Sequence, residues 1–407
     1  MRSTATRRWA SIAGVVTVGA MVLAACSSSS TTTESSAPAA ATSAAAASPA
    51  ASAAASSAAP AECTTPTPVK LQLQWFAQAQ FAGYYAAKDK GFYKDQCLDV
   101  TILEGGVDIV PQTQLAQGNA DFAIAWVPKA LASREQGAMI TNVAQVFQRS
   151  GTLQVSWADS NIKTPADFKG KKIGNWGFGN EFEIFAALSQ EGLDPAKDVT
   201  LVAQQFDMTG LLKKQIDAAE AMTYNEYAQL LEAKNPKTGK LYQPSDFNVI
   251  SYEASGVGML QDSIWASTER LSDPAYQDVT QKFVTASLAG WIYCRDNAAE
   301  CADLVTANGS KLGKSHQLWM MNEINRLIWP SPNGIGVMDP AAWDRTVKIS
   351  LETKNLEGST VITAAPGDDS YTDTYAKAAN QTLESMGLNT TGEEFVAIEV
   401  TLNEGGN

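Results

Sequence analysis

Histidine is almost absent from this chain: among its 407 residues the only one is His316. A Ser–His–Asp triad or a multi-histidine metal site would have to be built on that residue. It lies in KSHQLWMMNEINRL, a helical pattern, where we expect an ordinary surface or packing residue. The sequence also lacks a GxxxxGK phosphate loop and a GxGxxG fingerprint. We therefore predict no enzyme, no metal site and no cofactor.

Basic residues are few as well, with 30 Lys and Arg against 43 Asp and Glu and a net charge of −13. An acidic surface argues against nucleic acid and against direct adsorption to anionic lipid. The Gly-rich segment GNWGFGNE at 174–181 precedes a helix but contains no lysine. Glu181 and Glu183 complement that helix N-terminus themselves and would repel an added phosphate. A neutral ligand fits this segment better.

The first 62 residues differ in composition from the rest of the chain. Residues 1–25 have a basic start and an apolar stretch too short and interrupted for a membrane span, as in a signal peptide. LAAC at 23–26 resembles the lipobox of bacterial lipoproteins, which implies cleavage before Cys26 and lipidation of its sulfur. The alternative is an ordinary cleaved signal with a chance cysteine. The rest of 26–62, rich in Ser, Ala, Thr and Pro, predicts a disordered tether.

Four further cysteines suggest disulfides in an exported protein. Three pairings are possible. We favour Cys63–Cys97, because both residues precede strands that are expected to be neighbours, and Cys294–Cys301, because the two bracket a short loop between helical segments. The alternative is four free, buried thiols.

The rest of the chain alternates strands and helices, the pattern of a parallel sheet with helices on both faces. A first block has strands at 69–74, 98–103 and 121–126, each followed by a helix. A second block begins after Asn161, with strands ending near 176, 203 and 223. We expect an α/β protein of two lobes: lobe 1 at 63–157 and 255–386, its second part mostly helical, and an inserted lobe 2 at 158–254. An acidic tail, 387–407, would follow, and its FVAIEVTL could add a strand.

Two segments resemble each other: LAQGNADFAIAWVP at 115–128 and LLKKQIDAAEAMTYNE at 211–226. Each reads as a helix, a turn, an Asp and a small-residue strand that ends in an aromatic, Trp126 or Tyr224. Two sheets that each deliver an aromatic from a strand's carboxyl end could face each other across a ligand cleft. The alternative is chance similarity between short strand–helix units.

Aromatic and amide side chains gather at the predicted strand ends. Rings stack on planar ligands, while amides and carboxylates read donor and acceptor edges. Each aromatic alone is more often a core residue. Taken together, they predict a ligand site that suits a flat, neutral heteroaromatic. The predicted ligand-binding residues are Trp75, Gln78, Phe81, Tyr84, Trp126, Trp176, Asn180, Glu181, Tyr224, Asn225 and Glu226.

LQLQWFAQAQFAGYYAAKDKGFYKDQCLDVTI at 71–102 resembles the opening of the thiamine-pyrimidine type of periplasmic-binding-like proteins. DFKGKKIGNWG, GLDPAKDVTLV and AEAMTYNEYAQLLE are similar to that group's second lobe. The resemblance runs from about Val69 to about Tyr375. It implies a type II periplasmic-binding fold, with two lobes joined by two crossovers around a cleft that closes on a small molecule. We expect a hinge motion, with 75–84 as one wall of the cleft and Trp176 and Tyr224 opposite. The resemblance also implies the permease and ATPase of an ABC importer as membrane partners. Together with the lipobox, it leads us to expect a monomer, lipid-anchored on the extracytoplasmic face of the cell membrane.

Three ligand classes follow from this resemblance. A thiamine pyrimidine precursor or a riboflavin-like compound ranks first, because the expected cleft segments offer Trp, Tyr, Asn and Glu, with Lys129 as their one basic residue. A sulfonate, nitrate or taurine-type anion ranks second. A thiamine-pyrimidine synthase-like enzyme ranks third, since those enzymes carry a Cys-rich motif and an iron-binding histidine set that this chain lacks.

Overall fold

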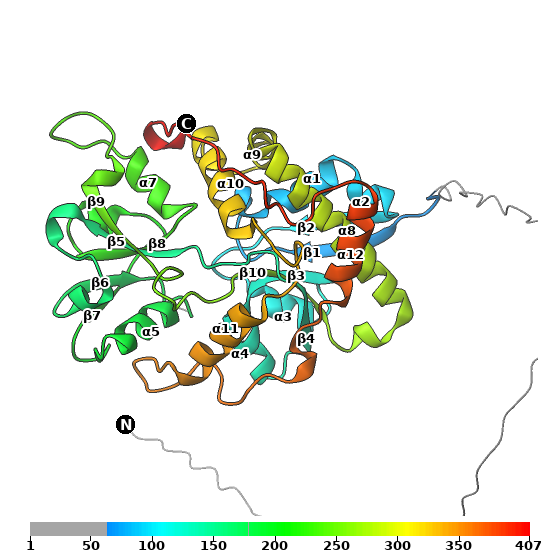
Figure 1. The fold of residues 1–407 in the computed structure, drawn as a ribbon, viewed down its shortest axis with the longest axis horizontal. Coiled ribbons are helices and arrows are strands. Elements are labelled where there is room, and N and C mark those ends of the chain that lie inside the picture. The colour runs from blue at the N-terminus through cyan, green and yellow to red at the C-terminus, as the bar shows by residue number, and fades with distance from the viewer. Residues whose placement is uncertain (1–62, 178) are drawn as a thin grey trace, which may run out of the picture. The chain divides into compact units, whose positions relative to one another are not determined.

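The computed structural model describes residues 63–177 and 179–407, which contain two five-stranded sheets with helices around them (Figure 1). Lobe 1 holds the sheet β2-β1-β3-β10-β4, and lobe 2 holds the sheet β7-β6-β8-β5-β9. The strands of the first are β1 (Thr67–Gln72), β2 (Leu98–Leu103), β3 (Phe122–Trp126), β4 (Ile140–Ala144) and β10 (Asp262–Ser267). Those of the second are β5 (Thr152–Trp157), β6 (Lys172–Asn175), β7 (Thr200–Ala203), β8 (Ala218–Met222) and β9 (Phe247–Ser251).

The two sheets share one topology. In each, the first three strands pair in parallel, and a single antiparallel strand, β10 or β5, lies between the third strand and the edge strand. The sequence predicted parallel sheets, so these two strands are a correction. Each follows a crossover and therefore enters its sheet from the opposite end. β3 and β8, whose sequences resemble each other, hold equivalent positions, so the similarity reflects a structural repeat.

The chain crosses between the lobes twice. It leaves the first sheet after β4 and enters the second at β5, then returns between β9 and β10. Lobe 2 therefore includes 152–157, whereas the sequence predicts these residues in lobe 1. The alternating apolar residues of this strand gave no sign of which sheet it joins.

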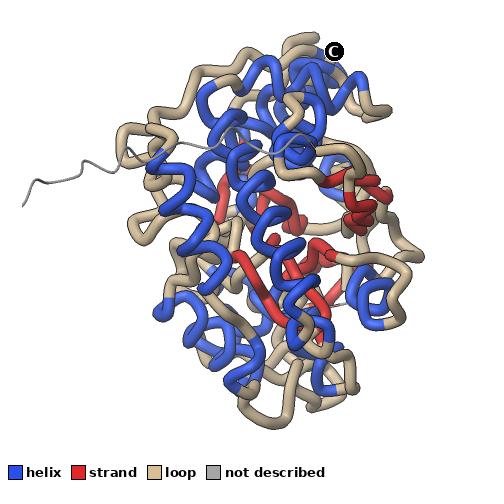
Figure 2. Tube along the Cα trace, turned by 90° about the vertical axis from the view of Figure 1, so that its right-hand side faces the viewer, coloured by secondary structure: helices blue, strands red, loops and turns tan. Residues whose placement is uncertain are grey.

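Helices cover both sheets (Figure 2). In lobe 1, α1 and α8 pack so closely that a Cβ on Gly290 would lie 2.0 Å from the carbonyl oxygen of Gly83. Helices of lobe 1 are α1 (Ala82–Asp89), α2 (Phe92–Asp95), α3 (Pro111–Ala116), α4 (Val127–Glu135), α8 (Pro274–Asp296), α9 (Ala298–Ala307), α10 (Lys314–Ile328), α11 (Pro340–Glu352) and α12 (Thr374–Ser385). Those of lobe 2 are α5 (Phe182–Gln190), α6 (Thr209–Leu212) and α7 (Glu226–Glu232).

The acidic tail adds no strand, so that expectation is wrong. FVAIEVTL instead runs along α10, where Ile398 N donates to Asn322 Oδ1 at 2.9 Å and Asn403 N donates to Ser315 Oγ at 3.1 Å. Side-chain partners on the helix thus satisfy two backbone groups that a sheet would otherwise have to pair. The tail ends beside α7 of lobe 2, where Lys234 and Glu404 form an ion pair at 2.5 Å.

Both favoured disulfides are present, so the predicted pairing is confirmed. Cys63–Cys97 joins the starts of β1 and β2, and Cys294–Cys301 joins α8 to α9. The Cα atoms are 5.4 Å apart in the first pair and 5.6 Å apart in the second. Strand pairing in the first case and a tight helix–helix turn in the second bring the thiols together.

Removing the second bond by Cys294→Ala with Cys301→Ala should lower the free energy of unfolding by roughly 2 kcal/mol, because the closed loop is short. Urea denaturation under oxidising conditions measures this. A reducing agent that opens both bonds should abolish the difference between variant and parent. A difference that persists under reduction would show that lost packing, not the cross-link, is responsible.

In the described part of the chain, no helix combines the length and apolarity that a membrane crossing requires. The predicted signal peptide, Cys26 and the tether lie within 1–62, outside the described residues.

Candidate functional site

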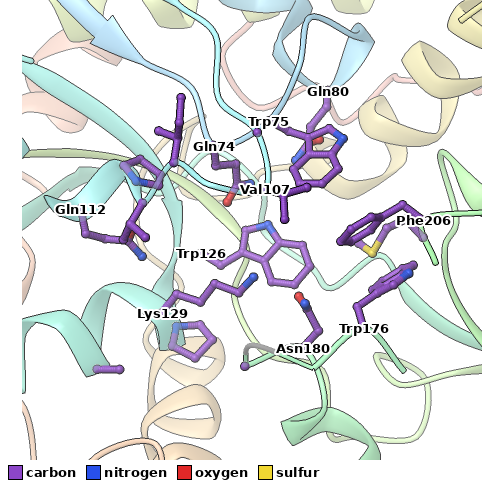
Figure 3. A pocket seen from close by; sticks show the side chains of 18 of the residues that line it. Gln74, Trp75, Gln80, Val107, Gln112, Trp126, Lys129, Trp176, Asn180 and Phe206 are labelled. Atoms are coloured by element: carbon purple, nitrogen blue, oxygen red, sulfur yellow. The ribbon is translucent and has the colours of Figure 1, made fainter. Parts of the chain in front are cut away.

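A cavity of about 520 Å³ lies where the two lobes face each other (Figure 3). Its walls come from the carboxyl ends of β1 and β3 in lobe 1 and of β6 and β8 in lobe 2, the usual place for ligands in open α/β sheets. The lining residues are Gln74, Trp75, Gln78, Gln80, Gly106, Val107, Ile109, Val110, Pro111, Gln112, Trp126, Pro128, Lys129, Ala132, Ser133, Trp176, Gly179, Asn180, Phe182, Phe206, Met222, Tyr224, Asn225, Glu226, Thr360 and Val361.

Three aromatic rings form a continuous wall across the two lobes. The ring of Phe206 lies 4.9 Å from that of Trp75 and 6.2 Å from that of Trp176, nearly parallel to the latter at 21°. Two hydrogen bonds hold Trp176 in place. Its backbone N–H donates to Glu220 at 2.8 Å, and its indole N–H donates to the Gln205 carbonyl at 3.2 Å. Side chains held in this way offer a preorganised stacking surface.

Trp126 enters the cavity from the lobe 1 side (Figure 3). Its indole Nε1 donates to Asp262 Oδ1 at 2.7 Å, and the Lys129 ammonium lies 4.8 Å from its ring centroid. Burial lowers the pKa of Lys129 below its usual value. The nearby carboxyls of Glu220, Glu181 and Asp262 act in the opposite direction but do not cancel this effect. Among the described lining residues Lys129 is the one basic side chain, as the sequence predicted for the cleft.

Three polar side chains of lobe 2 that line the cavity form hydrogen bonds within the protein. Glu226 accepts from Met222 N and from Asn225 Nδ2, both at 2.9 Å, and burial raises its pKa to about 7. Asn180 Nδ2 donates to the Gly177 carbonyl at 2.7 Å. These bonds fix the orientation of the Asn180, Asn225 and Glu226 side chains at this side of the cavity.

His316 is not the surface or packing residue that we expected. It is 1% exposed, and its ring joins the lobes: Nδ1 lies 2.8 Å from Glu232 Oε1 and Nε2 lies 3.0 Å from Asn225 Oδ1. The ring belongs to α10 of lobe 1, whereas both partners belong to lobe 2. Its link to a cavity residue was hidden in the sequence by a separation of 91 positions.

The structure brings eight of the eleven predicted site residues to the cavity. They are Trp75, Gln78, Trp126, Trp176, Asn180, Tyr224, Asn225 and Glu226. Each lies at or just after the carboxyl end of a strand, or on the loop that follows it. Their contact with a ligand remains a prediction.

Phe81, Tyr84 and Glu181 do not line the cavity. Phe81 and Tyr84 are buried in the core of lobe 1, where the Tyr84 ring meets Trp291 of α8 edge-on at 5.5 Å. Glu181 instead accepts from Gly179 N at 2.9 Å. The correction has a simple cause: α1 begins at Ala82 and turns these aromatics toward α8, so the wall that we expected over 75–84 ends at Gln80.

Several residues of the site were not among those predicted. Phe206 follows β7 and could have been found by the same strand-end rule. Gln74, on the loop after β1, and Gln112, on α3, are ordinary amides and carried no signal. Asp262 lies behind the wall, and only the folded chain brings it to Trp126, 136 positions away.

The chain is similar to a protein family and to several named proteins. The profile of a family described as NMT1/THI5 like matches residues 78–301, more than half of the chain. A Haemophilus influenzae protein named for thiamine biosynthesis is 28% identical over 188 residues, 46% of this chain and 59% of that protein. The riboflavin-binding protein RibY of Chloroflexus aurantiacus is 28% identical over 308 residues, 71% of this chain and 82% of that one.

Two further relatives differ in kind. The formylaminopyrimidine-binding protein of Halalkalibacterium halodurans is 20% identical over 284 residues, covering 69% of this chain and 83% of that protein. A 4-amino-5-hydroxymethyl-2-methylpyrimidine phosphate synthase of Saccharomyces cerevisiae is 25% identical over 162 residues, covering 39% of this chain and 47% of the enzyme. The alignment with the binding protein therefore extends much further.

Among solved structures, the periplasmic aliphatic sulphonate binding protein SsuA of Escherichia coli superposes with a TM-score of 0.52 at 14% identity, covering 83% of this chain and 94% of that one. At this identity the similarity shows the fold alone. It confirms the predicted fold class, a periplasmic-binding-protein architecture of two α/β lobes.

Proposed function

Because the chain belongs to the family described as NMT1/THI5 like, we propose that it is the solute-binding component of an ABC importer. It captures a small planar heteroaromatic nutrient, either a thiamine pyrimidine precursor or a riboflavin-like compound. The observation that carries this proposal is the wall of Trp75, Phe206 and Trp176, which spans both lobes at the cavity. A flat ring between the lobes would contact both, so its binding would favour closure.

The size and polarity of the cavity support the same proposal. About 520 Å³ falls within the usual range for small-molecule sites, and the lining combines aromatic rings with a few amides. Relatives named for binding riboflavin and formylaminopyrimidine align over most of the chain. The ligand would remain chemically unchanged, and the protein would not act as an enzyme.

The location belongs to the same proposal. Lipidation of Cys26 and a tether over 26–62 would hold the two lobes, as a monomer, at the extracytoplasmic face of the membrane, near the permease and ATPase. A Cys26→Ala variant found in the soluble fraction would support the anchor. A variant that stays with the membrane would rule this anchor out.

An anion such as a sulfonate is the second candidate, since the fold is shared with a sulphonate-binding protein. The carboxyl groups of Glu220, Glu181 and Asp262 disfavour it, because they lie near Lys129, the one basic side chain among the described lining residues. A synthase is the third candidate. Its iron-binding histidine set cannot be assembled from one histidine that is already bonded to Glu232 and Asn225.

The direct test is mass spectrometry of small molecules released from the purified domain that starts at Cys63, followed by calorimetric titration with riboflavin, an aminopyrimidine and taurine. Stoichiometric binding of either ring compound without turnover supports the proposal. Binding of taurine alone, or chemical conversion of the ring compound, would overturn it.

Trp176→Ala should weaken binding of the ring compound roughly ten- to hundredfold, since it removes one stacking face. Trp176→Phe keeps a ring at this position and should recover most of the affinity. Fluorescence titration of both variants measures the effect. Equal affinities for the alanine variant and the parent would remove Trp176 from the site.

A further inference from the structure

Asp262 is the meeting point of three cavity-lining side chains. It is the first residue of β10 and is 2% exposed. Oδ1 accepts from Gln74 Nε2 at 2.6 Å and from Trp126 Nε1 at 2.7 Å. Gln80 Nε2 lies 3.1 Å from Oδ1 and 3.0 Å from Oδ2. One buried carboxylate thus receives hydrogen bonds from two segments of the lobe 1 wall, the connection between β1 and α1 and the end of β3.

These bonds determine which way the amides face. A carboxylate only accepts hydrogen bonds, so Gln80 must turn its NH₂ group toward Asp262 and its oxygen the other way. That oxygen accepts from Gln78 Nε2 at 2.6 Å. Gln78 must therefore turn its own oxygen away from Gln80, and among the described residues no group donates to this atom. Since Gln78 lines the cavity, its oxygen is available there as an acceptor.

Gln74 is oriented in the same way. Its NH₂ group is bonded to Asp262, and Figure 3 shows its oxygen turned toward the middle of the cavity, near Trp126. The lobe 1 side of the site therefore presents two amide oxygens, of Gln74 and Gln78, whose direction depends on the negative charge of Asp262.

We propose that Asp262 determines ligand specificity by fixing Gln74 directly, and Gln78 through Gln80, as hydrogen-bond acceptors in the cavity. The ligand edge that faces lobe 1 accordingly carries N–H donors, as in an amino-substituted heteroaromatic. This inference rests on the proposed function and narrows its ligand class. A ring whose corresponding edge carries only methyl or ether groups would leave both oxygens without partners, which a site of this kind rejects.

The test compares ring compounds of similar shape at pH 8.5. Because burial raises the pKa of Asp262 to about 7, the side chain is ionised at that pH. The probes are 2,4-diaminopyrimidine, which carries donors, and 2,4-dimethylpyrimidine, which does not. Calorimetry on the parent domain should show at least a tenfold preference for the diamino compound.

Asp262→Asn should reverse the orientation of the Gln78 amide. The asparagine keeps its oxygen toward Trp126 and Gln74 but places an NH₂ group against Gln80. The Gln80 amide then rotates so that its oxygen accepts from the asparagine and its NH₂ group faces Gln78. The Gln78 amide rotates in response, and one of its N–H groups points into the cavity. We expect the preference for the diamino probe to fall at least tenfold, and 2,4-dimethoxypyrimidine, which offers acceptors, to bind better than it does to the parent.

A second variant keeps the test decisive if Asp262→Asn does not fold. Gln78→Met replaces the last amide with an apolar side chain of similar size, so the diamino preference should fall as well. If the double variant folds, Asp262→Asn should change the preference no further in the Gln78→Met background. A purely structural role of Asp262 would instead weaken all probes equally, with or without Gln78.

The outcomes separate this inference from the proposed function. A parent domain that binds no pyrimidine or flavin refutes the proposed function itself. A parent domain that binds these rings without preferring the diamino probe, or variants that retain the full preference, would overturn the role of Asp262 while the binding function stands.

Discussion

His316→Leu should lower the free energy of unfolding by about 3–5 kcal/mol, because it leaves a buried carboxylate without its partner. Glu232 is buried beside the ring, and its Oε1 lies 2.8 Å from Nδ1. The other ring nitrogen faces Asn225 Oδ1, and the bond from Asn225 Nδ2 to Glu226 sets that amide orientation. The ring therefore faces an oxygen at each nitrogen and links the Glu232 carboxylate to the Asn225 amide.

This bond also joins the lobes at the cavity. Asn225 and Glu232 lie at the two ends of α7, while His316 lies on α10. Because Asn225 lines the cavity, the leucine variant should also bind the ring compound more weakly. Urea denaturation measures the stability, and calorimetry measures the affinity.

The matched control is His316→Leu combined with Glu232→Leu. It removes the carboxylate together with the ring, so it should recover at least half of the stability that the single variant loses. A single variant as stable as the parent would show that the bond between His316 and Glu232 does not stabilise the fold. A double variant no better than the single one would mean that lost packing, and not the unpaired carboxylate, sets the cost.

Glu183→Gln should raise the free energy of unfolding by about 3 kcal/mol at pH 8 and change it little at pH 4. Glu183 is 5% exposed on α5, and its Oε1 accepts from Met259 N at 2.6 Å. Burial raises its pKa from 4.5 to about 7. The folded protein therefore holds this proton between about pH 4.5 and 7, where the unfolded chain has lost it.

The direction of the effect follows from this difference. As the pH rises through that window, the unfolded chain loses the proton, whereas the folded state must either keep it or bury a charge. The parent therefore loses stability, and the full loss in its free energy of unfolding is reached above pH 7. Glutamine accepts from Met259 in the same way but cannot ionise. Urea denaturation at both pH values measures the difference, and Glu191→Gln at an exposed position serves as control. A variant less stable than the parent at pH 8 would show that Glu183 is needed as a carboxylate.

Local sequence patterns were sufficient for the architecture and for much of the cavity wall. Strand–helix alternation predicted two α/β lobes, and the spacing of the four thiols predicted both disulfides. Trp126, Trp176 and Tyr224 could be placed because a strand and its end are local features, and the fold class places such ends at the cleft.

Tertiary structure alone decided which of these residues face the cavity and how they are held. Tyr84 lies in the core because α1 packs on α8, about 200 positions later in the chain, and no local pattern encodes that contact. Only the closed fold brings Asp262 to Gln80 and His316 to Asn225, across 182 and 91 positions. Hydrogen bonds at such separations depend on how the sheets and helices pack together, and so the polarity of the cavity could not be inferred from the sequence.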